Sequence, residues 1–154
     1  DVGPELDPEG LAGIMVYLGR NPAARSHSEA ATALPYVLKG SANVPPERWM
    51  QEAQTHFVQT PEGLSITYDP HFRDAVEAGG EIPDLWPFFD ALAGKPTCLI
   101  RGVGSDLLSA ATARKMQDRR PDMIYAEVPD RGHVPFLDEP EAVAALGAWM
   151  EQMQ

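Results

Sequence analysis

Hydrophobic positions in the first half of the chain follow a helical period. From about residue 8 to 80, apolar side chains recur every three or four positions, in short runs that proline or glycine interrupts. Before the last of these runs, residues 64–68 alternate between apolar and polar, which predicts a brief extended segment. The runs themselves predict four helices, at about residues 8–18, 28–38, 46–57 and 71–78.

The second half of the chain has a different pattern, in which strands and helices alternate. Apolar strands that alternate with helices are typical of a parallel sheet covered on both faces. In the last helix we expect Asp138 to be the capping residue and Glu141 to complete a capping box. The buried stripe of this helix is predicted to comprise Val143, Leu146, Trp149 or Met150, and Met153. The predicted elements are a helix over residues 85–92, a strand over 97–101, a helix over 109–118, a strand over 123–128 and a helix from about 140.

Two strands are too few for a stable sheet of this kind, because each strand needs neighbours to satisfy its backbone groups. We therefore expect further strands, either in another polypeptide or in a longer form of this one. The first residue is Asp1 and not Met, which favours a processed, trimmed or partial product. The segment is expected to be incomplete as a standalone domain.

Composition and charge narrow the classes of function. The chain has 154 residues, 44% of them hydrophobic, and a formal net charge of −11. An acidic surface repels phosphate groups, so neither nucleic acid nor an anionic membrane surface is an expected partner. No run approaches the roughly 20 apolar residues of a membrane span, and no secretion signal begins the chain. Cys98 is the one cysteine, so a cysteine-rich metal site is excluded and the cytoplasm is the expected compartment. No cluster of histidine, cysteine, aspartate and glutamate has metal-ligand spacing, and no cofactor is expected.

Two residues carry the candidate chemistry, and each follows a predicted strand. Asp106 comes after the strand that ends at Arg101, and His133 comes after the strand that ends at Val128. Catalytic groups collect at the carboxyl ends of parallel strands, so both residues are predicted at one edge of the sheet. A carboxylate there would orient the imidazole, which would then take a proton from a nucleophile. Glycines in both loops are expected to keep them tight and to leave room for a substrate.

The expected nucleophile has no obvious position in the chain. The G-x-S-x-G pattern of a nucleophile elbow is absent. Ser65, in Gly63-Leu64-Ser65-Ile66-Thr67, comes nearest to it, but its segment alternates straight through and reads as extended, whereas an elbow is a sharp turn. Ser65 is therefore a poor candidate, and the chain carries an acid and a base without their serine.

The last third of the chain resembles the C-terminal part of an α/β-hydrolase-fold enzyme. Two motifs carry the resemblance, namely Pro96–Gly102 leading to Ser105–Leu108, and Gly132-His133 followed by Pro135 and Asp138–Glu141. Upstream the likeness is less specific. Residues 1–6 look like the segment that leaves the sixth strand in esterase-like members, the helical stretch looks like their cap, and Tyr68-Asp69-Pro70 looks like its return to the sheet.

The resemblance implies a fold class and a division of the chain. The fold would be α/β, the C-terminal part of a doubly wound, mostly parallel sheet with a helical cap. Residues 1–7 would leave a sheet strand, 8–80 would form the cap and 81–154 the C-terminal part of the core. The family order of serine, acid and histidine would make Asp106 the acid and His133 the base. Asp1 falls where some members of the fold carry an alternative acid, but Asp106 has the fuller motif and is preferred.

The implied activity is that of a carboxylesterase-like serine hydrolase on small esters. Its serine would come from the N-terminal half of the same hydrolase, as a clipped or separate chain of the same gene. Lactone, epoxide, C–C-bond and halide-releasing hydrolases are rivals within the fold. A non-catalytic binding or association subunit is a rival of another class. Five aromatic residues either line an acyl pocket beneath the cap or belong to the core, namely Trp49, Phe57, Trp86, Phe88 and Phe89.

Overall fold

The chain is an α/β protein that divides into two compact units. The computed structural model describes residues 1–80 and 82–153. The sheet unit comprises Asp1–Gly10, Gly40–Ala42 and Pro83–Gln154. The helical unit comprises Leu11–Lys39 and Asn43–Ile82.

The sheet unit contains the two parallel strands that the sequence predicts. Strand β3 (Cys98–Gly102) pairs with β4 (Ile124–Val128), and the register runs from Cys98 opposite Ile124 to Gly102 opposite Val128. Helix α6 (Ala110–Arg119) connects the two strands, with Ser109 as its N-cap. A parallel pair requires such a crossover, and the predicted strand–helix–strand order is confirmed.

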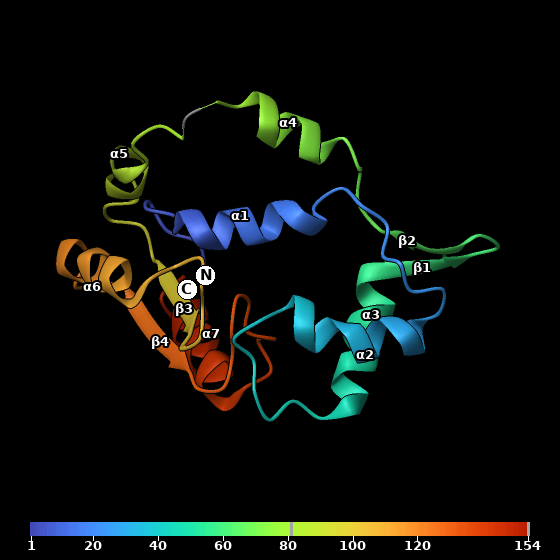
Figure 1. The fold of residues 1–154 in the computed structure, drawn as a ribbon. Coiled ribbons are helices and arrows are strands. Elements are labelled where there is room, and N and C mark those ends of the chain that lie inside the picture. Colours follow the sequence, from blue (N-terminus) through green and yellow to red (C-terminus); the bar gives the residue numbers. More distant parts are fainter. Residues whose placement is uncertain (81, 154) are drawn as a thin grey trace. The chain divides into compact units, whose positions relative to one another are not determined.

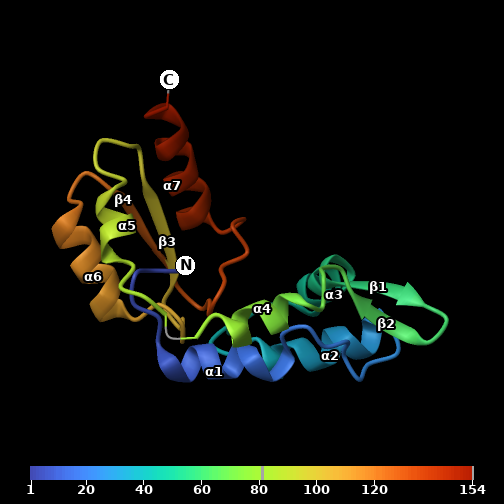
Figure 2. The same ribbon diagram turned by 90° about the horizontal axis from the view of Figure 1, so that it is seen from above.

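Helices cover both faces of this sheet (Figure 2). Helix α5 (Trp86–Asp90) and α6 lie on one face, and α7 (Pro140–Glu151) lies on the other. Trp86 packs against the hydrophobic core of the unit, and Phe88 is exposed. The buried core members come from α5, β3, α6 and the connections between them, and they are Phe89, Leu99, Leu108, Ala113, Met116 and Met123.

The buried stripe predicted for α7 is wrong. The side chains of Val143, Met150 and Met153 are more than half exposed, whereas Ala142 and Ala145 are buried. The small alanine side chains allow the helix to approach the sheet closely, so the face that packs is the one with small residues and not the one with large ones. Leu146 and Trp149 are half-buried beside this alanine face.

The cap predicted for α7 is wrong as well. The N-cap residue is Glu139 and not Asp138, and its side chain makes no capping hydrogen bond. The Glu139 carboxylate binds Arg131 instead, within the loop that precedes the helix.

The helical unit combines short helices with a hairpin (Figure 1). Helix α1 (Pro8–Tyr17) begins in the sheet unit and continues into the helical unit. Within the helical unit, α2 packs against α3, where Trp49 and Ala53 are buried. The elements that follow α1 are α2 (His27–Val37), α3 (Pro46–His56), β1 (Phe57–Thr60), β2 (Gly63–Ile66) and α4 (Phe72–Ala78).

Strand β1 is an element that the hydrophobic pattern did not predict. Phe57 was expected at the end of the third helix, but it begins β1 and pairs with Ile66 of β2 in an antiparallel hairpin. The strand has only four residues, and its apolar and polar positions do not alternate cleanly enough to be distinguished from a helix end.

Within residues 1–80 and 82–153, no helix has both the length and the apolar character that a membrane span requires.

Candidate active site

The loops that follow β3 and β4 lie against one another at the carboxyl end of the sheet. The amide of Val103 donates to the carbonyl of Val128 at 3.0 Å. The amide of Gly104 donates to the carbonyl of Arg131 at 2.8 Å. Asp106 lies on the first loop and His133 on the second. Parallel pairing therefore brings both candidate residues to one edge of the sheet, as their positions after the strands predict.

Glycines allow these loops to touch through their backbones. A Cβ on Gly102 would lie 2.2 Å from the carbonyl oxygen of Gly132, and a Cβ on Gly104 would lie 2.4 Å from that of Gly40. Gly40 has a φ of +83° and would itself meet Gly104. The space beside these glycines is thus filled by backbone, whereas room for a substrate was expected there.

Residues 40–42, which the sequence did not connect with the site, form hydrogen bonds to the loop that carries His133. Ser41 accepts a hydrogen bond through its Oγ from the amide of Gly132 at 3.0 Å. The amide of Ala42 donates to the carbonyl of Asp130 at 3.0 Å. In the sequence these residues only follow the helix predicted at about residues 28–38, and no motif relates them to the loop of His133.

The first residues of the chain run along the loop that carries Asp106. The amide of Asp7 donates to the carbonyl of Leu107 at 3.0 Å, and Gly10 lies directly against the carbonyl of Asp106. The N-terminus lies beside β3 in both ribbon views (Figures 1 and 2). There the amide of Gly102 donates to Oδ2 of Asp1 at 3.2 Å.

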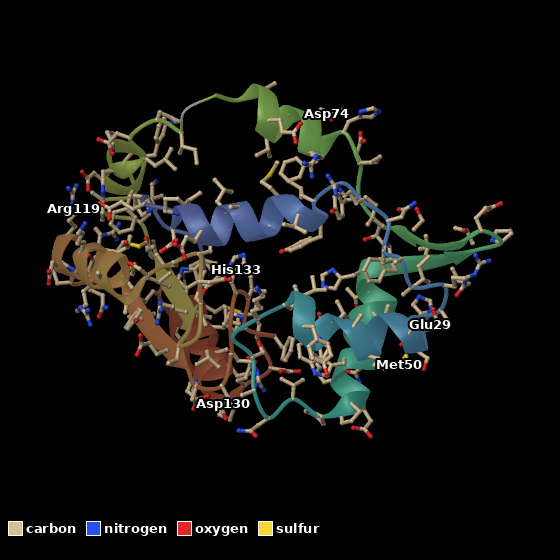
Figure 3. The ribbon with its side chains drawn as sticks, viewed as in Figure 1. Glu29, Met50, Asp74, Arg119, Asp130 and His133 are labelled. Atoms are coloured by element: carbon tan, nitrogen blue, oxygen red, sulfur yellow. The ribbon has the colours of Figure 1, made fainter. Side chains whose placement is uncertain are left out.

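The carboxylate of Asp1 binds the imidazole of His133. Oδ1 of Asp1 lies 2.5 Å from Nδ1 of His133. The Asp1 side chain has no exposed surface, and the His133 side chain is 18% exposed. Figure 3 shows His133 on the loop after β4, the loop that begins near Asp130. With Nδ1 engaged, Nε2 is the ring nitrogen available for proton transfer, and it makes no hydrogen bond within residues 1–80 and 82–153.

Burial sets the direction of the histidine pKa. Burial lowers the pKa of His133 below its usual value, whereas the negative charge of Asp106 acts in the opposite direction. A lowered pKa keeps the imidazole neutral near pH 7, and a neutral imidazole can accept a proton.

Asp106 lies near His133 without a hydrogen bond to it. Its side chain is exposed, and its carboxylate influences the imidazole only through its charge. The sequence preferred Asp106 as the acid, and the family resemblance allowed Asp1 as the alternative. The geometry favours Asp1, because Asp1 is the buried acid in contact with the ring. The catalytic role of either carboxylate stays a prediction.

The remaining candidates lie in ordinary structural settings. Ser65 lies in β2, in the extended conformation that its pattern predicts, and its Oγ donates to Asn21 at 3.2 Å. The other histidines bind nearby groups: His27 the carbonyl of Phe57, His56 the side chain of Glu52, and His71 that of Asp74. Among the described residues, no group of histidine, cysteine, aspartate and glutamate side chains could hold a metal ion.

A model of the alpha/beta hydrolase family matches residues 3–146. The chain belongs to this family. Among solved structures, it is similar to an alpha/beta hydrolase from Novosphingobium aromaticivorans, with 39% sequence identity and a TM-score of 0.88, over 99% of this chain and 55% of the other. The fold is also that of E-2-(acetamidomethylene)succinate hydrolase, at 23% identity and a TM-score of 0.70, over 99% of this chain and 55% of the other.

Two curated relatives of this family member are named as a hydrolase and an esterase. The 3-hydroxybutyrate-oligomer hydrolase of Cupriavidus necator is 34% identical over 94% of this chain and 52% of its own length. The pimeloyl-[acyl-carrier protein] methyl ester esterase of Aromatoleum aromaticum is 42% identical over 34% of this chain and 21% of its own length. The chain thus spans about half the length of the first of these relatives, and a shorter part of the second.

Proposed function

We propose that this chain supplies the base and the acid of a serine hydrolase that cleaves small esters. The observation that carries the proposal is the hydrogen bond between Asp1 and His133, because a buried carboxylate on Nδ1 is what a catalytic imidazole requires. The carboxylate fixes the ring orientation and stabilises the imidazolium that forms during the reaction.

The reaction proceeds by acyl transfer. Nε2 of His133 takes the proton of a serine hydroxyl while the serine oxygen attacks the ester carbonyl carbon. The ester C–O bond then breaks, and His133 returns the proton to the departing alcohol. Water, activated by the same imidazole, releases the acid and restores the serine. Asp1 stays ionised throughout, and backbone amides outside this chain hold the oxyanion.

The serine is proposed to belong to an N-terminal half of the same hydrolase, in the same gene product or in a separate chain. The absence of G-x-S-x-G from these 154 residues and the greater length of the relatives support this assignment. The amide of Ile124 donates to the carbonyl of Thr97, and the amide of Val103 donates to the carbonyl of Val128. In a parallel pair, every second residue of a strand directs its backbone N–H and C=O towards the neighbouring strand, here β4. Cys98 and Ile100 therefore present their backbone groups outwards.

That outer edge of β3 is the proposed contact with the N-terminal half. No strand of the described residues pairs with it, since the parallel sheet there has two strands. A partly apolar groove lies beside the edge, lined in part by Val2, Ile100 and Trp149. A further parallel strand would satisfy the free backbone groups and cover the groove.

Esters are proposed as the substrate class on the strength of the relatives. One relative is named for the methyl ester that it cleaves, and another for the hydrolysis of 3-hydroxybutyrate oligomers.

The thiol of Cys98 is free, and we propose the cytoplasm as the location of the enzyme.

The test is ester hydrolysis by the complete hydrolase, meaning this chain together with the proposed N-terminal half. Nitrophenyl acetate and butyrate are suitable first substrates. The His133→Gln variant is expected to lose about 10³-fold or more in kcat, and His71→Gln, an exposed histidine in α4's N-cap, is the matched control with unchanged kcat. Turnover by His133→Gln equal to that of the control would contradict the proposal, and so would the absence of ester cleavage by the unmodified protein.

A further inference from the structure

We propose that Arg131 and Glu139 are positioning residues, which hold the loop between them in the conformation that presents His133 to Asp1. The proposal rests on the proposed function in one respect only, namely that His133 is the catalytic base. Neither Arg131 nor Glu139 is expected to touch the substrate.

The ion pair closes the loop that contains the histidine. Nε of Arg131 donates to Oε1 of Glu139 at 2.6 Å, and the amide of Phe136 donates to the same oxygen at 3.1 Å. The Arg131 guanidinium also lies over the Phe136 ring, 5.0 Å from its centroid. One carboxylate oxygen thus ties together three points of the loop, on both sides of His133.

Arg131 extends this bracket to the segment 40–42. Its Nη1 donates to the carbonyl of Ala42 at 3.2 Å and to that of Asp130 at 2.8 Å. The same segment holds the amide of Gly132 through Ser41. Gly132, which precedes His133, is consequently held by Ser41 through its amide and by the contact of Arg131 with Ala42.

Burial gives the pair its rigidity. The side chain of Glu139 is 7% exposed and that of Arg131 is 16% exposed. Burial opposes ionisation of Glu139, but hydrogen bonds from its own amide and that of Phe136, together with Arg131, outweigh burial and hold the pKa below its usual value. A charged carboxylate therefore stays in place across the neutral range.

Stability alone does not account for this arrangement. The second oxygen of Glu139, Oε2, is buried and has no hydrogen-bonding partner within residues 1–80 and 82–153. A buried ion pair of this kind is often no more stable than an apolar pair of the same size. The ion pair instead fixes the conformation of the loop, because the two side chains bind each other in one geometry only.

The test compares Glu139→Gln with Glu141→Gln in the complete hydrolase. Glu141 is an exposed acid in the first turn of the same helix, α7, and serves as the matched control. The Nδ1 proton of His133 and its titration are followed by NMR on protein labelled at histidine nitrogen. We expect Glu139→Gln to broaden or lose the Nδ1 proton signal and to lower kcat about 10- to 100-fold with little change in KM.

The NMR readout separates this proposal from the proposed function. If the unmodified protein cleaves no ester but Glu139→Gln still alters the Nδ1 proton, the function is wrong and the positioning role stands. If Glu139→Gln is folded and its Nδ1 signal and kcat match those of Glu141→Gln, the positioning role is overturned. Should Glu139→Gln fail to fold, Arg131→Lys, which keeps the charge but not the Nε hydrogen bond, is judged by the same two outcomes.

Discussion

The carboxylate of Asp1 and the imidazole of His133 lie 2.5 Å apart although 132 positions separate them in the chain. They meet because the first residues of the chain run along the loop after β3, where the amide of Gly102 binds the second oxygen of Asp1. Asp1 is therefore oriented by the end of one strand and His133 by the loop that follows the next. The pair is a product of the parallel sheet.

Asp1→Asn is expected to impair the complete hydrolase far more than Asp106→Asn. An amide in place of the buried carboxylate no longer stabilises the imidazolium and favours the wrong tautomer, which costs about 10⁴-fold in kcat. Asp106 makes no hydrogen bond to the ring, so its variant is expected to keep kcat within about tenfold. Steady-state kinetics on a small ester measure both, and a larger loss in Asp106→Asn would assign the acid role to Asp106.

His133 is expected to titrate below the usual histidine pKa, and Asp106→Asn is expected to lower its pKa further. Burial favours the neutral ring, whereas the charge of Asp106 favours the protonated one. Because the folded state binds this proton more weakly than the unfolded state, His133 stabilises the fold less as the pH falls through the histidine range. NMR titration of the ring gives the midpoint directly. An unchanged midpoint in Asp106→Asn would show that the two groups do not interact.

Gly40→Ala is expected to destabilise the protein by about 2 to 5 kcal/mol, as a sum of backbone strain and overlap with Gly104. Its Cβ would lie 2.2 Å from the carbonyl oxygen of Gly104. The control is Gly94→Ala, since Gly94 also has a positive φ but nothing lies within 4 Å of its Cβ position. That variant is expected to lose only about 1 to 2 kcal/mol. Chemical denaturation of both variants measures the difference, and equal losses would contradict the close backbone contact.

Tyr125 is expected to stay protonated well above the usual tyrosine range. Burial and the hydrogen bond to Glu127 raise its pKa from 10.0 to about 12. The folded state then binds the proton more tightly than the unfolded state, so the free energy of unfolding falls as the pH rises from about 10 to 12. Tyrosinate absorbance, compared between the unmodified protein and Tyr125→Phe, reports the titration. A Tyr125 midpoint near 10 would contradict the combined effect of partial burial and the Glu127 hydrogen bond on this pKa.

Much of the sheet unit could be predicted from the sequence, because its elements have strong periodic signals. The strands β3 and β4 are short apolar runs between helices, and the parallel pairing follows from their crossover through α6. The position of His133 after β4 then places it at the carboxyl edge of the sheet without further information. The strand β1 was missed because four residues are too few for alternation to be recognised.

The contacts of the site could not be predicted, because they join segments that no local pattern relates. The motif after β3 drew attention to Asp106, whereas contact with His133 depends on the path of residues 1–10. The bracket formed by Arg131 and Glu139 was missed because residues 138–141 were expected only to begin a helix, with Asp138 as its cap, whereas the Glu139 carboxylate turns back into the loop. Likewise, the hydrophobic pattern of α7 did not show which face packs against the sheet. The alanine face packs because its small side chains allow the helix to approach closely.

The most direct test of the central claim is labelling of the complete hydrolase with a fluorophosphonate, which modifies an activated serine. The labelled residue is then identified by peptide mass spectrometry, and the labelling rates of the unmodified protein and of His133→Ala are compared. We predict a single labelled serine outside these 154 residues and a fall in the labelling rate of about 10³-fold in His133→Ala. A label on a serine within this chain, or a labelling rate that does not depend on His133, would contradict the account.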